Sequence, residues 1–538
     1  MPALVPIRDV SEDEYVIPVP KLIGDHLDRH AADRPNQAFM VQDGRRLTYA
    51  EAKQQVDDTA AALIAAGIEP GDRVSYLGNP TIEFWVSFLA ISGIGAIWLG
   101  LNPKYTSGEI DHVVGDAAPR LIFSFAEIDG EPQHAEFDRL RAAHPSIEDI
   151  VTLSTDGNDA FASWRSTVGP AASRDELAAR RDAVASLDPA FLVYTSGSTG
   201  RPKGALITHR GSNVCNSIAV ERKHLSDRTI ICNLPVNHVG AIGDICGRVM
   251  TGGGTIHFQE RFSPEAMLTT IEAEQLNTVG GVPTMLQLCV DHPRFAETDL
   301  SSIELIAWGG AAMPAELLQQ LLDKTGAPYC TMGYGMTEVT GGVTYSGLTD
   351  SVDLLAETIG TPDSRQAIRI WHPDGRLAEA GEAGEIQAWG DYLMAGYWQN
   401  PEATAAAFTD DGWFHTGDLA VWRDDGFLQI VGRMSEMFKS GGYNVYPREV
   451  ELALEEHPDV SMAAVVKVSD PTFQEVGVAY VMGTSSLDPV ALRSFAGERL
   501  ANYKVPKRIE VLDELPMLPI GKVDKKQLEA RAASADDT

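Results

Sequence analysis

The strongest chemical signal in the chain is a short segment of small hydroxyl residues and glycines, Tyr194-Thr-Ser-Gly-Ser-Thr-Gly-Arg-Pro-Lys-Gly204. Glycines let a backbone approach a ligand closely, and amide and hydroxyl donors can surround phosphate oxygens. Lys203 would add a positive charge. The spacing is not that of a Walker A loop, because Pro202 stands where that motif has its second glycine. Taken alone, the segment predicts either a phosphate-binding loop or a plain Ser/Gly turn.

Small and polar residues also follow other apolar runs that predict strands. Residues 230–234 lead into Pro235-Val-Asn-His238, residues 305–308 into Gly309-Gly310, and residues 328–330 into Gly333-Tyr-Gly335. Strands that alternate with helical patterns predict a mostly parallel sheet, whose ligand sites gather at the carboxyl ends of the strands. We therefore expect one cleft shared by several of these loops.

The chain is long enough for two domains. Its 538 residues exceed what a single hydrophobic core supports. Past about residue 430 the pattern changes to one of alternating short helices and strands, at residues 447–456, 462–468, 476–482 and 489–500. We expect an α/β fold, with a large N-terminal domain of α/β layers and mostly parallel sheets over residues 1–432. A small α+β C-terminal domain would cover residues 433–538.

Composition narrows the class of protein. With 43 Lys and Arg against 76 Asp and Glu, the formal charge of −33 argues against a nucleic-acid or anionic-membrane partner. Five scattered cysteines and an N-terminus without an apolar core are typical of a cytoplasmic protein. Residues 84–101 carry no charge, but Gly93 and Gly95 divide them. We expect a buried helix, turn and strand there, and no membrane span.

Several further segments stand in a fixed order around the loop. They are Leu47-Thr-Tyr-Ala-Glu51, Pro235-Val-Asn-His238, Gly333-Tyr-Gly-Met-Thr-Glu338, Trp413-Phe-His-Thr-Gly-Asp418, Gly432-Arg433, Gly441-Gly-Tyr-Asn-Val-Tyr-Pro-Arg-Glu-Val450 and Pro519-Ile-Gly-Lys522. Together, over nearly the whole chain, they resemble the motifs of the adenylate-forming superfamily. That superfamily includes acyl-CoA synthetases, peptide-synthetase adenylation domains and beetle luciferases. Within it, the chain is most similar to fatty or aryl acid:CoA ligases.

The resemblance implies a role for each matching residue. The β- and γ-phosphates of ATP would be held by Thr195, Ser196, Gly197, Ser198, Thr199 and Lys203. Adenine would stack on Tyr334 beside Gly310, Ala311 and Ala312, while Asp418 and Arg433 would bind the ribose. Thr337 would contact the α-phosphate, Glu338 would bind Mg²⁺ together with Thr195, and His238 would lie at the mouth of the acyl pocket. Without the resemblance, each of these residues has an ordinary structural reading, such as a turn, core or exposed position.

The implied reaction has two halves. A carboxylate attacks the α-phosphate to give an acyl-adenylate and pyrophosphate, and Lys522 would bridge the two anions. The thiol of coenzyme A then takes the acyl group and releases AMP. In the resembling enzymes the small domain rotates between the halves, which here places the hinge at Ser435 and brings Gly441 and Gly442 to the thiol. Many relatives have Asp or Lys at the hinge, so the assignment of Ser435 is left open.

Coenzyme A phosphates could contact Lys439, or the basic residues Lys504, Lys507 and Arg508, which read equally well as an exposed face. Candidate acyl-pocket residues lie at 238–242, 308–312 and 339–343, and most are small. We therefore expect a medium- or long-chain fatty acid or a bulky aryl or alicyclic acid. The alternatives are an enzyme that loads a carrier protein, a luciferase-like oxidative enzyme and a non-catalytic nucleotide-binding relative. The oligomeric state is left open, with a homodimer as one option.

Overall fold

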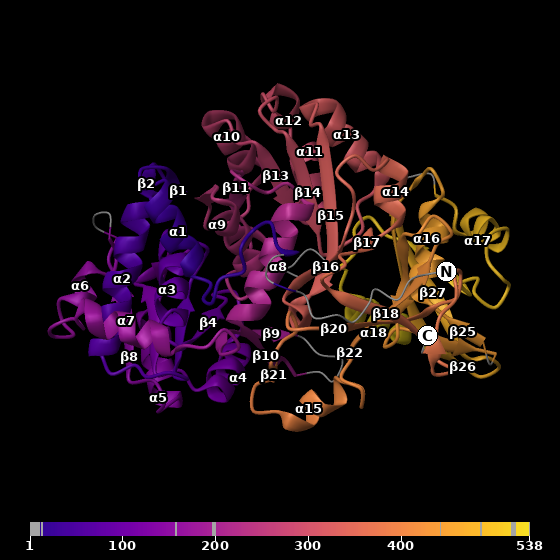
Figure 1. The fold of residues 1–538 in the computed structure, drawn as a ribbon. Coiled ribbons are helices and arrows are strands. Elements are labelled where there is room, and N and C mark those ends of the chain that lie inside the picture. Colours follow the sequence, from indigo (N-terminus) through magenta and orange to yellow (C-terminus); the bar gives the residue numbers. More distant parts are fainter. Residues whose placement is uncertain are drawn as a thin grey trace.

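The computed structural model describes residues 11, 14–155, 159–195, 201–441, 443–484, 487–517 and 523–536. Within them, the N-terminal region of the chain builds four larger sheets and the C-terminal region builds a fifth. Figure 1 shows the sheets in sequence from the purple N-terminal lobe to the yellow C-terminal one, with the magenta helix α8 (His209–Arg222) between them.

Two sheets form the N-terminal lobe. The smaller has the order β11 (Thr229–Cys232), β12 (Thr255–Phe258), β1 (Ala38–Gln42) and β2 (Arg45–Thr48). The larger has the order β21 (Gly396–Tyr397), β10 (Lys203–Thr208), β9 (Pro189–Thr195), β4 (Ile97–Leu101), β3 (Arg73–Leu77), β5 (Leu121–Phe125) and β8 (Asp149–Leu153). From β9 to β8 the neighbouring strands are parallel. The predicted α/β class is therefore confirmed here.

The uncharged stretch at residues 84–101 forms a buried helix and strand, as predicted. Every residue of α3 (Ile82–Ser92) and of β4 is buried. Thr81 caps α3 by accepting a hydrogen bond from the Phe84 amide, and Gly95, at φ +80°, makes the turn to the strand. Among the described residues, no helix is long and apolar enough to cross a membrane.

The third sheet carries most of the candidate site. Its order is β13 (Thr278–Gly281), β14 (Leu305–Gly309), β15 (Tyr329–Met336), β16 (Gly341–Tyr345) and β17 (Thr361–Pro362). The first three strands are parallel, but β16 runs antiparallel to β15. The expected loop at residues 333–335 is wrong, because pairing with β16 keeps those residues in strand β15.

The fourth sheet is antiparallel throughout, and the sequence pattern did not predict it. It has the order β19 (Arg376–Leu377), β18 (Ala367–His372), β20 (Gly384–Trp389), β22 (Phe414–Trp422) and β23 (Leu428–Arg433). Strand β10 likewise follows the glycine-rich loop where the overall pattern led us to expect a helix; helix α8 starts only at His209.

The C-terminal region has the predicted α+β pattern. Helix α16 (Pro447–Glu455) is followed by β26 (Val460–Asp470), β27 (Gln474–Gly483), α17 (Pro489–Gly497) and α18 (Lys525–Asp536). Two short strands, β24 (Phe438–Ser440) and β25 (Tyr443–Val445), join the edge of the β26–β27 sheet, and β28 (Arg508–Val511) pairs with β27. The boundary expected at residues 432 and 433 falls at the end of β23, and it stays a prediction.

Candidate active site

The glycine-rich loop is bordered by two paired strands. Thr195, the last residue of β9, lies opposite Lys203, the first residue of β10. The Lys203 ammonium lies 4.4 Å from the centre of the Tyr397 ring, which β21 supplies. The strand pair therefore brings a hydroxyl and an ammonium to one edge of the sheet. Ser196, Gly197, Ser198 and Thr199 lie outside the described residues.

Glu338 joins this edge from the third sheet. It sits in the short 3₁₀ helix η3 (Thr337–Val339), directly after β15. Its Oε1 atom accepts hydrogen bonds from the Thr195 hydroxyl and from the Tyr397 hydroxyl, each at 3.1 Å. Its backbone carbonyl accepts a third, from the Met394 amide at 2.9 Å. Two segments distant in sequence, one ending at Thr195 and one at residues 394–397, thus contact Glu338.

Tyr397 was missed by the sequence analysis. Burial, together with the neighbouring Glu338 carboxylate, raises the pKa of its phenol, so it remains a hydrogen-bond donor. The aromatic pair Tyr397-Trp398 ahead of the helix start at Pro401 is the only signal that could have drawn attention to it.

The oxygen set around Glu338 suits a hard divalent cation. Mg²⁺ is typically held by one or two protein oxygens while substrate phosphates and water complete its shell. Glu338 and Thr195 supply such oxygens side by side. No group of three or more His, Cys, Asp or Glu side chains in the described ranges could hold a metal alone.

Asp418, Tyr334 and Arg433 form a second cluster. Asp418 on β22 is opposite Arg433 on β23. One carboxylate oxygen accepts from the Arg433 Nε at 2.8 Å, and the other accepts from the Tyr334 hydroxyl at 2.7 Å. The Asp418 side chain is 4% exposed and that of Arg433 is 52% exposed. A nearly buried carboxylate of fixed orientation therefore has spare lone pairs for a ligand hydroxyl.

Neighbouring residues hold Asp418 in place. The Thr416 hydroxyl accepts from the Asp418 amide at 3.1 Å and donates to the Ile386 carbonyl at 2.6 Å. Glu385 accepts from the Gly417 amide at 3.1 Å. Gly417 adopts φ +72°, a conformation that glycine reaches without strain.

The expected adenine pocket lies beside this cluster. Gly309 pairs with Gly333, so the segment that follows β14 borders the residue before Tyr334. Gly310, Ala311 and Ala312 in that segment are exposed. Burial, and then Asp418, raises the pKa of the Tyr334 phenol.

Thr337 and His238 each lie at or just before the start of a short helix. Thr337 is buried at the start of η3. His238 precedes the π-helix η2 (Gly240–Gly247), and its Nδ1 accepts from the Gly240 amide at 3.0 Å. The loop at residues 235–238 packs closely on β4, because a Cβ added to Gly100 would lie 2.7 Å from the Val236 carbonyl oxygen.

The C-terminal region contributes further candidate residues. Lys439 and Gly441 are exposed, and the Gly441 amide donates to the Phe473 carbonyl at 2.9 Å. Ser435 is exposed in the turn between β23 and β24. Lys522 and Gly442 lie outside the described residues.

The other basic candidates have mixed partners. Lys504 pairs with Glu449 and Arg508 with Glu510, which favours the reading of an internally paired basic face for these two. The Lys507 ammonium lies 4.4 Å from the centre of the Phe473 ring, beside Gly441.

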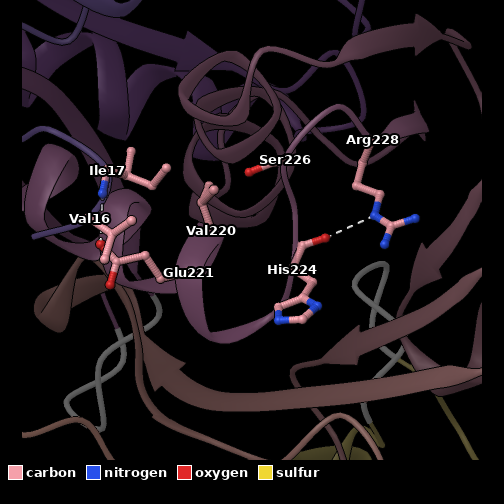
Figure 2. Close-up of a pocket in the computed structure, with 7 residues that line it drawn as sticks. All are labelled: Val16, Ile17, Val220, Glu221, His224, Ser226 and Arg228. Carbon is pink, nitrogen blue, oxygen red and sulfur yellow. Dashed lines mark hydrogen bonds between the residues drawn. The ribbon is translucent and has the colours of Figure 1, made fainter.

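A hollow of about 460 Å³ lies elsewhere, at the C-terminal end of α8 (Figure 2). It is lined by Val16, Ile17, Val220, Glu221, His224, Ser226 and Arg228. None of these is a candidate site residue, so this hollow is separate from the clusters above.

The chain is similar to several known proteins in sequence and in fold. The chain matches the family model of the AMP-binding enzyme over residues 27–398 and that of the AMP-binding enzyme C-terminal domain over residues 449–522. It is 37% identical to a feruloyl-CoA synthase of Amycolatopsis sp, across 94% of this chain and 97% of that protein. It is 34% identical to the 3-[(3aS,4S,7aS)-7a-methyl-1,5-dioxo-octahydro-1H-inden-4-yl]propanoyl:CoA ligase of Mycobacterium tuberculosis, across 93% and 97%. The structure of ATP-bound MatB from Rhodopseudomonas palustris superposes with a TM-score of 0.83 at 26% identity, across 95% and 98%. The chain therefore belongs to the family of AMP-binding enzymes.

Proposed function

We propose that this AMP-binding enzyme activates a bulky aryl or alicyclic carboxylic acid with ATP and transfers it to coenzyme A. The chain is an acid–thiol ligase of the AMP-forming kind, as are the relatives that it resembles over almost its full length. The convergence of Thr195, Tyr397 and Glu338 beside the Asp418 cluster is the observation that carries the proposal.

The nucleotide would lie between the two clusters. Asp418 would accept from the ribose hydroxyls and Tyr334 would face the adenine. Lys203 would donate to the outer phosphates, as its place opposite Thr195 allows. Mg²⁺, held by Glu338 and Thr195, would neutralise phosphate charge, so that an anionic carboxylate can approach the α-phosphate.

The carboxylate would approach Thr337 from the side of His238. Lys522 would bridge the carboxylate and the α-phosphate during adenylate formation, and it would leave when the C-terminal domain rotates about Ser435. Lys439, Gly441 and Gly442 would then face coenzyme A. A carrier-protein acceptor shares the same pantetheine chemistry, but the named relatives are CoA ligases, which favours coenzyme A.

The acid class follows from the small residues near Glu338. Gly341 and Gly342 on β16 and Gly240 and Gly243 on η2 are buried and add no side chains of their own to this region. The relatives' names include feruloyl and methyl-dioxo-octahydroindenyl propanoyl groups, which are ring systems of that kind.

The test is a pyrophosphate-release assay with ATP and Mg²⁺ across aryl, alicyclic and straight-chain acids, with and without coenzyme A. We expect acyl-CoA and AMP from ring-bearing acids only when coenzyme A is present. Pyrophosphate release without a thioester would move the proposal to a carrier-protein acceptor. Turnover confined to straight-chain acids would overturn the acid class.

A further inference from the structure

A lysine without a partner is buried next to the third sheet. Lys223 directly follows α8, and the whole residue is 4% exposed. Its ammonium lies 3.0 Å from where a Cβ on Gly333 would be, and 6.0 Å from the centre of the Tyr345 ring. In the described part of the chain, no hydrogen bond or ion pair to this ammonium is found within the usual distances. Lysine is almost never fully buried unless it is paired.

A second cation lies on the same side of the sheet. Arg248 begins α9 (Arg248–Gly252) and pairs with Asp244 of η2. Its side chain is 9% exposed, and its Nε has no hydrogen-bond partner among the described residues. Gln366 donates its amide to the Gly342 carbonyl at 2.9 Å, while its buried Oε1 also lacks a partner there. Two cations thus face one carboxylate in a region where unpaired polar groups are costly.

Arg248 and Lys223 lie along the β15–β16 hairpin, and Lys223 is the farther of the two from Glu338. A Cβ on Gly341 would lie 3.5 Å from an Arg248 terminal nitrogen. Gly341 pairs with Met336, whereas Gly333, beside Lys223, pairs with Tyr345. Met336 and Gly333 are separated by three steps along β15, or about 10 Å at the usual rise of a strand. Arg248 is therefore near the turn that carries Thr337 and Glu338, and Lys223 is deeper.

The three glycines on this path add no side chains of their own, so the side chains beside Gly341 and Gly342 are those of Asp244, Arg248 and Tyr345. Gly333, Gly341 and Gly342 all lie on the two paired strands, and α8 and η2 pack against β16 on the side of Lys223 and Arg248. Residues 339–343 are also those expected to line the acyl pocket. An acid whose carboxylate is at Thr337 would thus extend toward Lys223.

We propose that Lys223, with Arg248, recognises an oxygen acceptor at the end of the acid that is remote from the activated carboxylate. The acceptor is a ketone or a second carboxylate, roughly 10 Å from the reacting carbon by the strand geometry. This rests on the proposed function and narrows its substrate class, because a purely hydrocarbon ring or chain would leave the buried ammonium without a partner. Burial, and then the nearby Arg248, lowers the pKa of Lys223 to about 7, as expected of a cation that lacks its partner in the free protein.

The test compares matched acids. Acyl-CoA formation is measured for 3-cyclohexylpropanoate, its 4-oxo derivative and its 4-carboxylate, with the wild type, Lys223→Met and the control Lys104→Met, whose exposed lysine precedes α4 (Ser107–Ala117). Because a hydrogen bond to a charged group contributes about 1.5–3 kcal/mol, the wild type should favour an oxygen-bearing acid by about 10- to 150-fold in kcat/KM. Lys223→Met should remove that preference, and Lys104→Met should keep it.

The outcomes distinguish failure of the Lys223 proposal from failure of the proposed ligase function. Equal turnover of all three acids by the wild type, or an unchanged preference in Lys223→Met, would overturn the recognition role while leaving the ligase activity in place. If no thioester forms, binding of the same acids is measured by calorimetry with AMP present. If the wild type binds an oxygen-bearing acid and Lys223→Met does not, the recognition role is supported and the ligase proposal is contradicted. If neither protein binds the acids, both proposals are contradicted. The better of the two derivatives identifies the acceptor as a ketone or a carboxylate.

Discussion

Replacing Lys223 with Met should stabilise the free protein, and the gain should shrink as the pH rises. The pKa of Lys223 falls from 10.5 to about 7 in the folded protein. Between these values the unfolded chain binds a proton that the folded chain does not, so stability rises with pH across this window. The loss of stability caused by the buried cation is therefore greatest below pH 7, and it decreases toward zero as the pH approaches 10.5. Methionine has a similar shape and carries no charge to bury.

The two pKa values set the size of the effect. Linkage gives a gain of about 4–5 kcal/mol at pH 6.5 and about 2 kcal/mol at pH 9. For a chain of 538 residues, the usual unfolding entropy converts these figures to a rise in Tm of roughly 4 °C and roughly 2 °C.

The assay is differential scanning calorimetry of the wild type and Lys223→Met at both pH values, without ligands. Lys104→Met is the control, because its exposed side chain should leave Tm unchanged at both. A Tm that falls in Lys223→Met, or a gain that is equal at pH 6.5 and pH 9, would refute the idea that Lys223 is an unpaired buried cation.

The remaining predictions concern the nucleotide site. Asp418→Asn should raise the KM for ATP by about 10- to 100-fold in pyrophosphate exchange, because it weakens hydrogen bonds to a charged acceptor; Asp425→Asn, at the exposed turn of the same β22–β23 hairpin, is the control. Tyr397→Phe should raise the Mg²⁺ requirement about fivefold, since Glu338 loses one donor, and an unchanged Mg²⁺ titration would remove Tyr397 from the site. Lys522→Ala should slow adenylate formation by about 10²–10³-fold and largely spare thioester formation from supplied acyl-adenylate, whereas equal loss of both steps would contradict its role.

Part of the first cluster could be predicted from the pattern, because Thr195 and Glu338 lie where strands end. Thr195 at the end of β9 and Glu338 just after β15 are separated by 143 residues, yet their side chains are 3.1 Å apart. A strand followed by glycines and hydroxyl residues predicts a ligand-binding loop or a plain turn at the end of that strand. Asp418 and Arg433 were expected at one site only because their motifs resemble those of the adenylate-forming superfamily.

Tyr397 and Lys223 could not be found in this way. Tyr397 comes from a two-residue strand whose pairing with β10 depends on the whole sheet. Lys223 follows a helix and reads as an ordinary exposed lysine, because no local pattern indicates that the helix end is covered. Antiparallel β16 and the fourth sheet lacked a signal for a similar reason, since their partners are set by tertiary packing.

In the proposed function, adjacent residues of β15 would separate the nucleotide from the acid. Side chains alternate between the two faces of a strand, and Tyr334 reaches Asp418 while the Cβ position of Gly333 faces Lys223. The same strand then delivers Thr337 and Glu338 to the turn where the two substrates must meet. A change in the acid would thus act on one face of β15 and a change in the nucleotide on the other. For this reason, substitutions on the Lys223 side should alter the choice of acid with little effect on the affinity for ATP.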